Sequence, residues 1–473
     1  MKRPGLYTAA LLLPALSALP FAQTSRAARA NTAFQHTIIA LSGTAAPAGG
    51  NYLAQSFLNA TLNARHEVAF DATVSGPSGV TTGVFVGDGE TASTIALGIN
   101  PAGTSFGFVS NPFITPNGDV VFDVNGGDIF LNSARTIVAL VRDGDLAPGG
   151  GTVTPEGALV VNDHGAVAYV GDVSGSTAVQ GIFRADGQQT VSIARDDDTP
   201  PTGGSFTFLS NPVMNDRGQV AFFSEMTGGP ADFGVFRGDG GALTPVFVAN
   251  QIAPGGATFA DFGNPVINSH GQVAVLASLT NSASHLGLFV GDGTDAVAIA
   301  LQGQPAPKGG NYGGGIGGVS FQGPIRLNDR GEVAFNGVLT GGTSTSGIFR
   351  GNGERTTTIA LAGTIAAGTT GTFKSFDDFK LGIDGRIAFI ATLAIGVGGV
   401  DASNNRGIWV GTSDGDLQLV VRTGDVIAGK VLTRLPQFGI GKQFDMNENG
   451  ILWVGSFGLA KAAVFSRILD ENE

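Results

Sequence analysis

The stretch Asn215-Asp216-Arg217-Gly218-Gln219-Val220-Ala221-Phe222 returns, in varied form, along nearly the whole chain. A close copy runs from Asn328 to Phe335, and weaker copies fill the intervals around these two. The glycine-equivalent positions of the eight copies are His66, Gly118, Gly165, Gly218, Gly271, Gly331, Gly385 and Gly450. Their spacing ranges from 47 residues, between Gly118 and Gly165, to 65 residues, between Gly385 and Gly450. A repeat at a nearly regular period predicts a repeat architecture.

Each repeat contains four short apolar segments. In the fourth copy the first two are Pro212-Val213-Met214 and Val220-Ala221-Phe222, and the third is Gly234-Val235-Phe236. The fourth segment is clearest in the next copy, at Val297-Ala298-Ile299-Ala300-Leu301. These segments are rich in β-branched and aromatic residues, and they are apolar on consecutive residues, as in a sheet covered on both faces. Four strands in roughly 40 to 50 residues is typical of one blade of a β-propeller.

The two ends of the repeat region are complementary. Thr37-Ile38-Ile39-Ala40-Leu41 corresponds to a fourth strand without its first three, and the last copy stops after its third strand, near Val464-Phe465. An N-terminal strand that completes the C-terminal blade would close a ring and cover a sheet edge. We therefore predict an all-β, eight-bladed propeller of four-stranded blades, with residues 31–473 as a single domain.

The Asn-x-x-Gly segment is typical of a hairpin turn. Asparagine and aspartate side chains accept hydrogen bonds from backbone amides two residues on, and glycine readily adopts the positive φ that closes such a turn. We assign structural turn roles to Asn63, Asn162, Asn215, Asn268, Asn328 and Asn447, and to Gly118, Gly165, Gly218, Gly271, Gly331, Gly385 and Gly450.

These eight registered copies resemble the Asn-x-x-Gly-x-x-Ala-Phe tandem-repeat family of exported bacterial proteins. The resemblance covers nearly all of the chain after its N-terminal segment. It implies an exported repeat protein, and it brings no catalytic residues with it.

The N-terminus is typical of a secretory signal peptide. Lys2 and Arg3 precede an apolar stretch, and the Ala-x-Ala pattern at Ala28-Arg29-Ala30 suits cleavage after residue 30. We predict a signal peptide at residues 1–30, no membrane span after its removal, and a secreted or periplasmic protein, with cell-surface association as an alternative. The absence of cysteine from the chain excludes disulfides and thiolate metal sites. The net charge of -12 argues against nucleic acid as a partner.

Histidines and acidic clusters offer few candidate metal ligands. His66, His164 and His270 fall at hairpin tips on separate blades, where we expect them to be solvent-exposed and too far apart to share a metal. Asp196-Asp197-Asp198 could bind a hard cation such as calcium, but a solvated loop is the simpler interpretation. Asp377-Asp378 receives the same interpretation. We predict no metal and no cofactor.

The best candidate ligand contacts lie two residues before the turn asparagine. This position is Thr61, Phe113, Val160, Val213 and Val266 in the first five copies, and Arg326, Lys380 and Asp445 in the last three. On the innermost strands of consecutive blades, the three charged residues could line one side of the central channel and bind an anionic or polar ligand. An ion pair between blades, Lys380 with Asp445, is the alternative.

Two familiar catalytic motifs are absent from this chain. We find no His-Glu-x-x-His and no phosphate-binding loop. We therefore expect a non-enzymatic monomeric scaffold that binds an extracellular polysaccharide or protein partner through its loops. The competing hypothesis is an extracellular hydrolase or lyase with its site in the channel.

Overall fold

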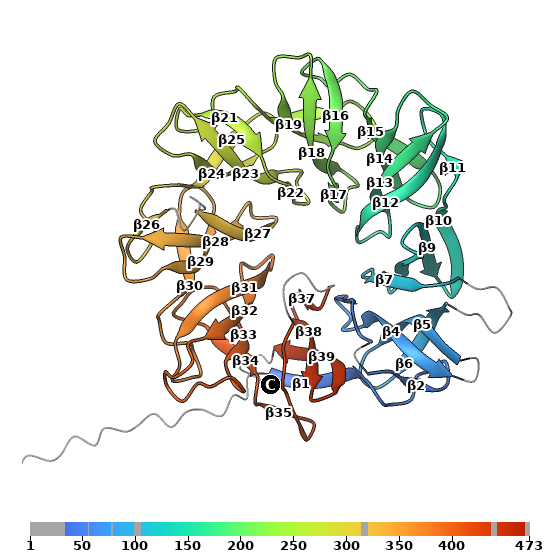
Figure 1. The fold of residues 1–473 in the computed structure, drawn as a ribbon, viewed down its shortest axis with the longest axis vertical. Helices are drawn as coiled ribbons and strands as arrows, with labels where there is room; N and C mark the ends of the chain where they lie inside the picture. The colour runs from blue at the N-terminus through green and yellow to red at the C-terminus, as the bar shows by residue number, and fades with distance from the viewer. Residues whose placement is uncertain are drawn as a thin grey trace, which may run out of the picture.

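The structure is a computed structural model, and it describes residues 34–54, 56–76, 79–98, 106–313, 320–436 and 442–468. The described residues form strands and turns and contain no helix. Figure 1 shows eight sheets arranged as blades around a common centre. The predicted eight-bladed β-propeller is therefore confirmed, whereas the predicted signal peptide at residues 1–30 lies outside the described residues.

Every blade is an antiparallel sheet of four or five strands. Blade 1 contains β2 (Asn51–Tyr52), β3 (Ala60–Leu62), β4 (Val68–Gly76), β5 (Gly79–Gly87) and β6 (Ala92–Leu97). Blade 2 contains β7 (Val109–Ile114), β8 (Val120–Val124), β9 (Asp128–Ser133) and β10 (Thr136–Val141), and blade 3 contains β11 (Asp145–Leu146), β12 (Thr152–Val161), β13 (Val167–Ser174), β14 (Gln180–Ala185) and β15 (Thr190–Arg195). Blade 4 contains β16 (Ser205–Leu209), β17 (Val213–Met214), β18 (Val220–Thr227), β19 (Phe233–Gly238) and β20 (Thr244–Val248).

The second half of the ring continues this order. Blade 5 contains β21 (Thr258–Phe262), β22 (Val266–Ile267), β23 (Val273–Thr280), β24 (Leu286–Gly291) and β25 (Ala296–Leu301). Blade 6 contains β26 (Asn311–Tyr312), β27 (Phe321–Leu327), β28 (Val333–Thr340), β29 (Ser346–Gly351) and β30 (Thr356–Leu361). Blade 7 contains β31 (Phe373–Leu381), β32 (Ile387–Leu393), β33 (Arg406–Gly411) and β34 (Gln418–Arg422), and the small pair β35 (Val426–Ile427) and β36 (Lys430–Val431) follows it. Blade 8 contains β37 (Phe444–Met446), β38 (Gly450–Phe457), β39 (Ala460–Ile468) and β1 (Phe34–Leu41).

The first strand of several blades is divided into two pieces, which the repeat pattern did not predict. In blade 4, β16 and β17 both pair with β18. Between them Ser210 continues the contact, because its amide donates to Phe223 O and its hydroxyl accepts from Phe223 N. Pro212 has no amide hydrogen to donate, so the ladder is interrupted there. The sequence pattern indicated only the inner piece, Val213–Met214.

The Val-Ala-Phe run supplies both faces of each sheet. In blade 6, Val333 and Phe335 pack in the core shared with blade 5, where Leu288 and Ile299 lie. Ala334, on the opposite face, packs in the core shared with blade 7, against Phe389 and its neighbours. All three residues of the run are fully buried. The apolar side chains on consecutive residues therefore follow from burial between two neighbouring blades.

The ring closes by pairing of the two ends of the chain, as predicted. β1 pairs antiparallel with β39, with Ile38 opposite Val464 and Leu41 opposite Ala462. Figure 1 shows β1, in blue, beside the red strands of blade 8. The N-terminal strand is thus the fourth strand of the C-terminal blade.

A buried hydrogen-bonded chain stabilises this closure. The indole Nε1 of Trp453 donates to Ser466 Oγ at 2.7 Å, and Ser466 Oγ lies 2.8 Å from His36 Nδ1. An indole N–H can only donate, so the serine hydroxyl proton is available to a neutral imidazole. Burial lowers the pKa of His36 below its ordinary value of 6.5. The ring closure therefore favours the uncharged form of His36.

This shift predicts a loss of stability in acid. The folded protein binds a proton at His36 less tightly than the unfolded chain, so stability falls as the pH drops below 6.5. His36→Gln is expected to flatten the dependence of the urea midpoint on pH between about pH 5 and pH 7. His164→Gln, at an exposed hairpin tip, is the control. Equal pH dependence in wild type and His36→Gln would contradict this interpretation.

Candidate functional site

Each turn asparagine makes bonds within its own turn and one bond to the next blade. The Oδ1 atom of Asn215 accepts from Arg217 N at 3.1 Å and from Gln219 N at 3.0 Å. Its Nδ2 atom donates to the carbonyl oxygen of Asn268, the equivalent residue of blade 5, at 2.8 Å. The same link to the next blade runs from Asn63 to Thr115, from Asn162 to Asn215, from Asn268 to Asn328, from Asn328 to Gly382 and from Asn447 to Asn63. We call these six asparagines the asparagine girdle.

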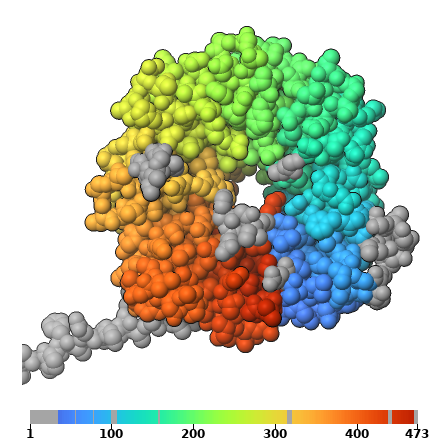
Figure 2. Space-filling model, viewed as in Figure 1, coloured from blue at the N-terminus to red at the C-terminus, as the bar shows by residue number. Residues whose placement is uncertain are grey.

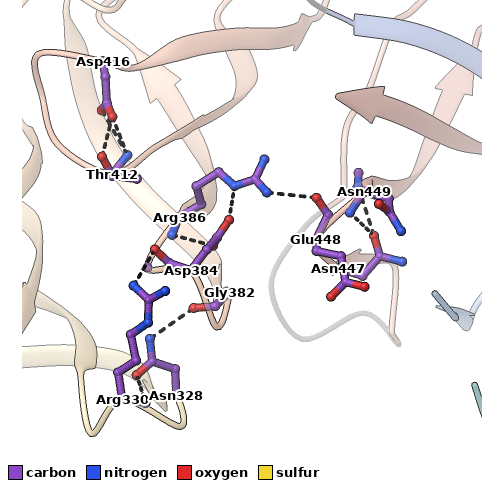
Figure 3. A network of polar contacts seen from close by, with 12 residues as sticks. Asn328, Arg330, Gly382, Asp384, Arg386, Thr412, Asp416, Asn447, Glu448 and Asn449 are labelled. Atoms are coloured by element: carbon purple, nitrogen blue, oxygen red, sulfur yellow. Dashed lines mark hydrogen bonds and ion pairs between the residues drawn. The ribbon is translucent and has the colours of Figure 1, made fainter. Parts of the chain in front are cut away.

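Blades 2 and 7 lack the asparagine and have Thr115 and Gly382 in its place. In blade 7, Arg386 takes over the link, because its Nη2 atom donates to Glu448 O of blade 8 at 2.9 Å. Arg330 of blade 6 donates in turn to Asp384 O of blade 7 at 3.2 Å. Figure 3 shows these contacts in sequence from Asn328 to Asn449. In blade 7 an arginine side chain thus supplies the connection to the next blade that the missing asparagine would make.

A second set of links comes from the arginine that follows the Gly-apolar-Phe triplet. Arg184 donates to Gly218 O, at the turn of the next blade, at 2.6 Å. Arg237 and Arg350 make the same contact with Gly271 O and Gly385 O. The recurring tetrapeptide Gly-apolar-Phe-Arg was visible in the sequence, although its partner in the next blade was not.

The turn glycines differ in conformation at the end of the ring. Positive φ is found at Gly118, Gly165, Gly218, Gly271, Gly331 and Gly385. Gly450 does not have a positive φ. The turn of blade 8 is one residue shorter than the others, with Asp445 paired with Leu452, so Gly450 is already the first residue of β38. A Cβ atom there would lie 2.5 Å from the Phe465 ring. The need for glycine at this position is therefore steric.

The three tip histidines do not share one environment. His164 and His270 are exposed, as expected. His66 is not: its φ is 65° and its ring stacks on Phe465 of blade 8 at 5.1 Å between centroids. The prediction of an exposed tip was wrong there, because the turn of blade 1 packs on the closing blade.

The carboxylates of the acidic cluster at residues 196–198 already have partners within the protein. Asp196 accepts from Val179 N, Asp197 pairs with Arg195 at 3.2 Å, and Asp198 accepts from Arg195 N. The three carboxylates therefore bond three different groups. Across the part of the chain that the structure describes, no group of three or more His, Cys, Asp or Glu side chains is arranged to hold a metal ion.

The inner strands surround an open channel with two unlike sides. Figure 2 shows the hole at the centre of the ring, and Figure 1 shows β17, β22, β27, β31 and β37 around it. Arg326 is on β27, Lys380 on β31 and Asp445 on β37. The equivalent residues of blades 2 to 5 are apolar and half-buried: Phe113, Val160, Val213 and Val266. One side of the channel is thus charged and the other is apolar.

The structure brings Arg326, Lys380 and Asp445 together across blade boundaries. Lys380 Nζ lies 4.0 Å from Asp445 Oδ1, so the ion pair between blades is present but long. Arg326 pairs instead with Asp378 at 3.1 Å and lies over the Phe379 ring. Burial lowers the pKa of Arg326, while the nearby Asp378 and Asp445 carboxylates oppose that shift. The four side chains keep 20 to 30% of their surface exposed, so these pairs add little stability and remain accessible.

A polar network that the sequence did not indicate continues this charged side into blade 1. The buried Asp71 carboxylate accepts from Leu58 N, Asn59 N and Asn59 Nδ2. Burial raises the pKa of Asp71, and these hydrogen bonds only partly offset the shift. Asn59 Oδ1 accepts in turn from Lys442 N of blade 8 at 2.9 Å.

The network has a counterpart in blade 2, where Asn111 and Ser110 donate to Asp123. Asp71 and Asp123 both follow the phenylalanine of their repeat, where four of the other six copies have an apolar side chain. This difference between copies was the signal available in the sequence.

The fold and this channel define a closed eight-bladed propeller with a charged channel wall. A profile of a family of unknown function (DUF7453) matches residues 14–286 and 280–434, and the chain belongs to that family. No curated protein matches the chain. Within the described ranges, no helix has the length and apolar character needed to cross a membrane.

Several solved structures are similar to this chain at low identity. An oligogalacturonate lyase in complex with manganese has 12% identity and a TM-score of 0.42, with 92% of this chain and 98% of that chain covered. The Dos1 propeller has 8% identity and a TM-score of 0.41, with 91% and 95% covered. A puromycin hydrolase has 11% identity and a TM-score of 0.41, and the match covers 85% of this chain and 58% of that one. These values are too low to transfer a function.

Proposed function

We propose that this protein is an exported, non-enzymatic propeller that acts as a monomeric scaffold and binds a polysaccharide or a protein partner. Export is supported by the signal-like segment at residues 1–30 and by the resemblance to the Asn-x-x-Gly-x-x-Ala-Phe repeat family. Arg326, Lys380 and Asp445 are the proposed ligand contacts.

One observation carries the proposal: charged side chains gather on one side of the channel, opposite an apolar side, and stay partly exposed. Arg326 and Lys380 have carboxylate partners, yet the Lys380–Asp445 distance of 4.0 Å leaves both groups able to bond a ligand. Ligand sites commonly combine apolar walls with a few polar groups that orient the ligand. The channel has both features.

The proposal is tested by binding to an array of glycans, and to exported proteins, with purified protein. Arg326→Gln, Lys380→Gln and Asp445→Asn keep the size of each side chain and remove its charge. Each is expected to weaken binding about tenfold, because each loses a charge-assisted hydrogen bond to the ligand.

Arg217→Gln is the matched control, since Arg217 is an exposed cation at the tip of blade 4. If all three channel variants bind like wild type, the channel is not the site. Loss of binding in Arg217→Gln as well would point to a general charge effect in place of a defined site.

A hydrolase or lyase acting in the channel remains the second candidate. Its support is a pair of residues with perturbed pKa values that both bond Asn59, Asp71 through its carboxylate and Lys442 through its backbone amide. The pKa of Asp71 is raised and that of Lys442 is lowered. Such perturbed groups are enriched at catalytic sites. Incubation of each bound glycan with the protein, followed by mass spectrometry, distinguishes the two candidates, because only an enzyme releases shorter products.

A further inference from the structure

Lys442 lies just before β37, and its backbone is held between two blades. Its amide donates to Asn59 Oδ1 at 2.9 Å, and its carbonyl oxygen accepts from Ala60 N at 2.7 Å. Asn59 is itself fixed by the Asp71 carboxylate, which accepts hydrogen bonds from Leu58 N, Asn59 N and Asn59 Nδ2. The base of the Lys442 side chain therefore has a defined position at the boundary of blades 8 and 1.

The ammonium group of Lys442 has no hydrogen bond or ion pair with any residue that the structure describes. Its neighbours on the charged side do have partners, Asp378 for Arg326 and Asp445 for Lys380. The Lys442 side chain is open to solvent, yet enough protein surrounds its ammonium that desolvation lowers its pKa. The positive charge of Lys380 lowers this pKa further, while Asp445 and Asp123 oppose the shift.

Lys380 lies close enough to Lys442 to lower its pKa, and the Lys442 ammonium has no partner among the described residues. This arrangement favours an anion between the two cations. Bringing a negative group to Lys442 would offset both the desolvation and the repulsion from Lys380. The net charge of -12 does not prevent this, because exposed charges farther away than about 8 Å are largely screened at physiological salt.

The apolar side chains on the opposite wall of the channel indicate which class of ligand fits it. Phe113, Val160, Val213 and Val266 present half-buried apolar side chains there. A pyranose ring has an apolar C–H face that packs on such side chains, and in a uronic acid or a sulfated sugar it also carries an anionic group at its edge. A ligand with both features matches a channel that is apolar on one side and has the Lys442 ammonium on the other, charged side.

We propose, building on the proposed function, that the ligand of the channel is an acidic polysaccharide whose carboxylate or sulfate group binds Lys442 and Lys380. Lys442 is the anchoring cation, and Arg326 lies on the same side. The buried Asp71–Asn59 contact positions Lys442 and does not touch the ligand.

The test uses calorimetric titration of the full protein with two matched pairs of oligosaccharides. One pair is a neutral oligosaccharide and its uronic acid equivalent, and the other is a sulfated oligosaccharide and its unsulfated equivalent. Wild type is expected to bind at least one acidic member about tenfold more tightly than its neutral partner. The two pairs distinguish carboxylate from sulfate as the recognised group.

Lys442→Gln is expected to remove this preference, and Lys442→Arg to retain most of it. Lys430→Gln, an exposed lysine on β36, is the control and should bind like wild type. Thermal unfolding of each variant checks that a loss of binding is not a loss of folding.

Equal binding of acidic and neutral members, no binding of either acidic member, or an acidic preference that survives in Lys442→Gln, would each overturn the inference. The proposed function would still stand if a neutral glycan or a protein bound wild type and Arg326→Gln weakened that binding. Failure of the two proposals is therefore distinguishable.

Discussion

Asn268→Ala is expected to lower the free energy of unfolding by about 3 kcal/mol, with one contribution from each hydrogen bond it loses. Asn268 Oδ1 accepts from His270 N at 3.1 Å and from Gln272 N at 2.9 Å. Its Nδ2 atom donates to Asn328 O at 3.0 Å and to Gln272 Oε1 at 2.8 Å. Only 3% of Asn268 is exposed, so water cannot easily replace these partners. Urea denaturation of wild type and variant measures the difference.

Two further variants separate the turn from the link between blades. His270→Ala changes an exposed side chain in the same turn and is expected to alter stability by less than about 0.5 kcal/mol. Asn268→Asp keeps the Oδ1 acceptor for the turn but replaces the donor to Asn328 O with an acceptor, which repels that carbonyl oxygen. If Asn268→Asp were as stable as wild type, the link to the next blade would contribute nothing. If Asn268→Ala behaved like His270→Ala, the girdle would have no role in stability.

The period of the repeat was sufficient to predict the fold, because each blade depends on segments that are close together in the sequence. The chain ends were predictable for a similar reason, since Thr37–Leu41 and the last copy each lack what the other contains. The link between blades was not predicted. It joins Asn215 to Asn268, equivalent residues that are 53 positions apart in the sequence. The contact becomes apparent only when neighbouring blades are placed side by side around the axis.

The candidate site was predictable only where it lies within the repeat. Comparison of equivalent positions identified Arg326, Lys380 and Asp445, and the structure brings these residues to adjacent inner strands. Asp378 was not identified as the partner of Arg326, because a register shift between Phe376 and Phe379 moves it out of the regular pattern. Lys442 lies outside the repeated motif, so comparison of the copies gave no signal for it.

Removal of residues 34–41 is expected to have the largest effect on folding. β1 contributes Phe34 to the core that blade 8 shares with blade 7, and Ile39 to the core shared with blade 1. Burying these two side chains contributes roughly 2 to 3 kcal/mol each, which is a large part of the 5 to 15 kcal/mol typical of a whole domain. The loss of β1 also leaves β39 as an open sheet edge, which favours association with other chains. The truncated protein is therefore expected to elute as aggregates or oligomers in size-exclusion chromatography and to lose its cooperative thermal transition.

The same eight residues supplied in another way should restore the fold. Phe34 lies opposite Ile468 in an antiparallel pair, so β1 can be placed directly after residue 468 through a two-residue Asn-Gly turn. This permuted chain has the same strand in the same blade and is expected to be monomeric and nearly as stable as wild type. A synthetic peptide of residues 34–41, added to the truncated protein during refolding, should rescue part of the monomer. A truncated protein that is monomeric and as stable as wild type would show that the terminal strand does not close the ring. Rescue by both the permuted chain and the added peptide would show that the ring is closed by pairing with β39 and does not depend on how β1 is connected to the chain.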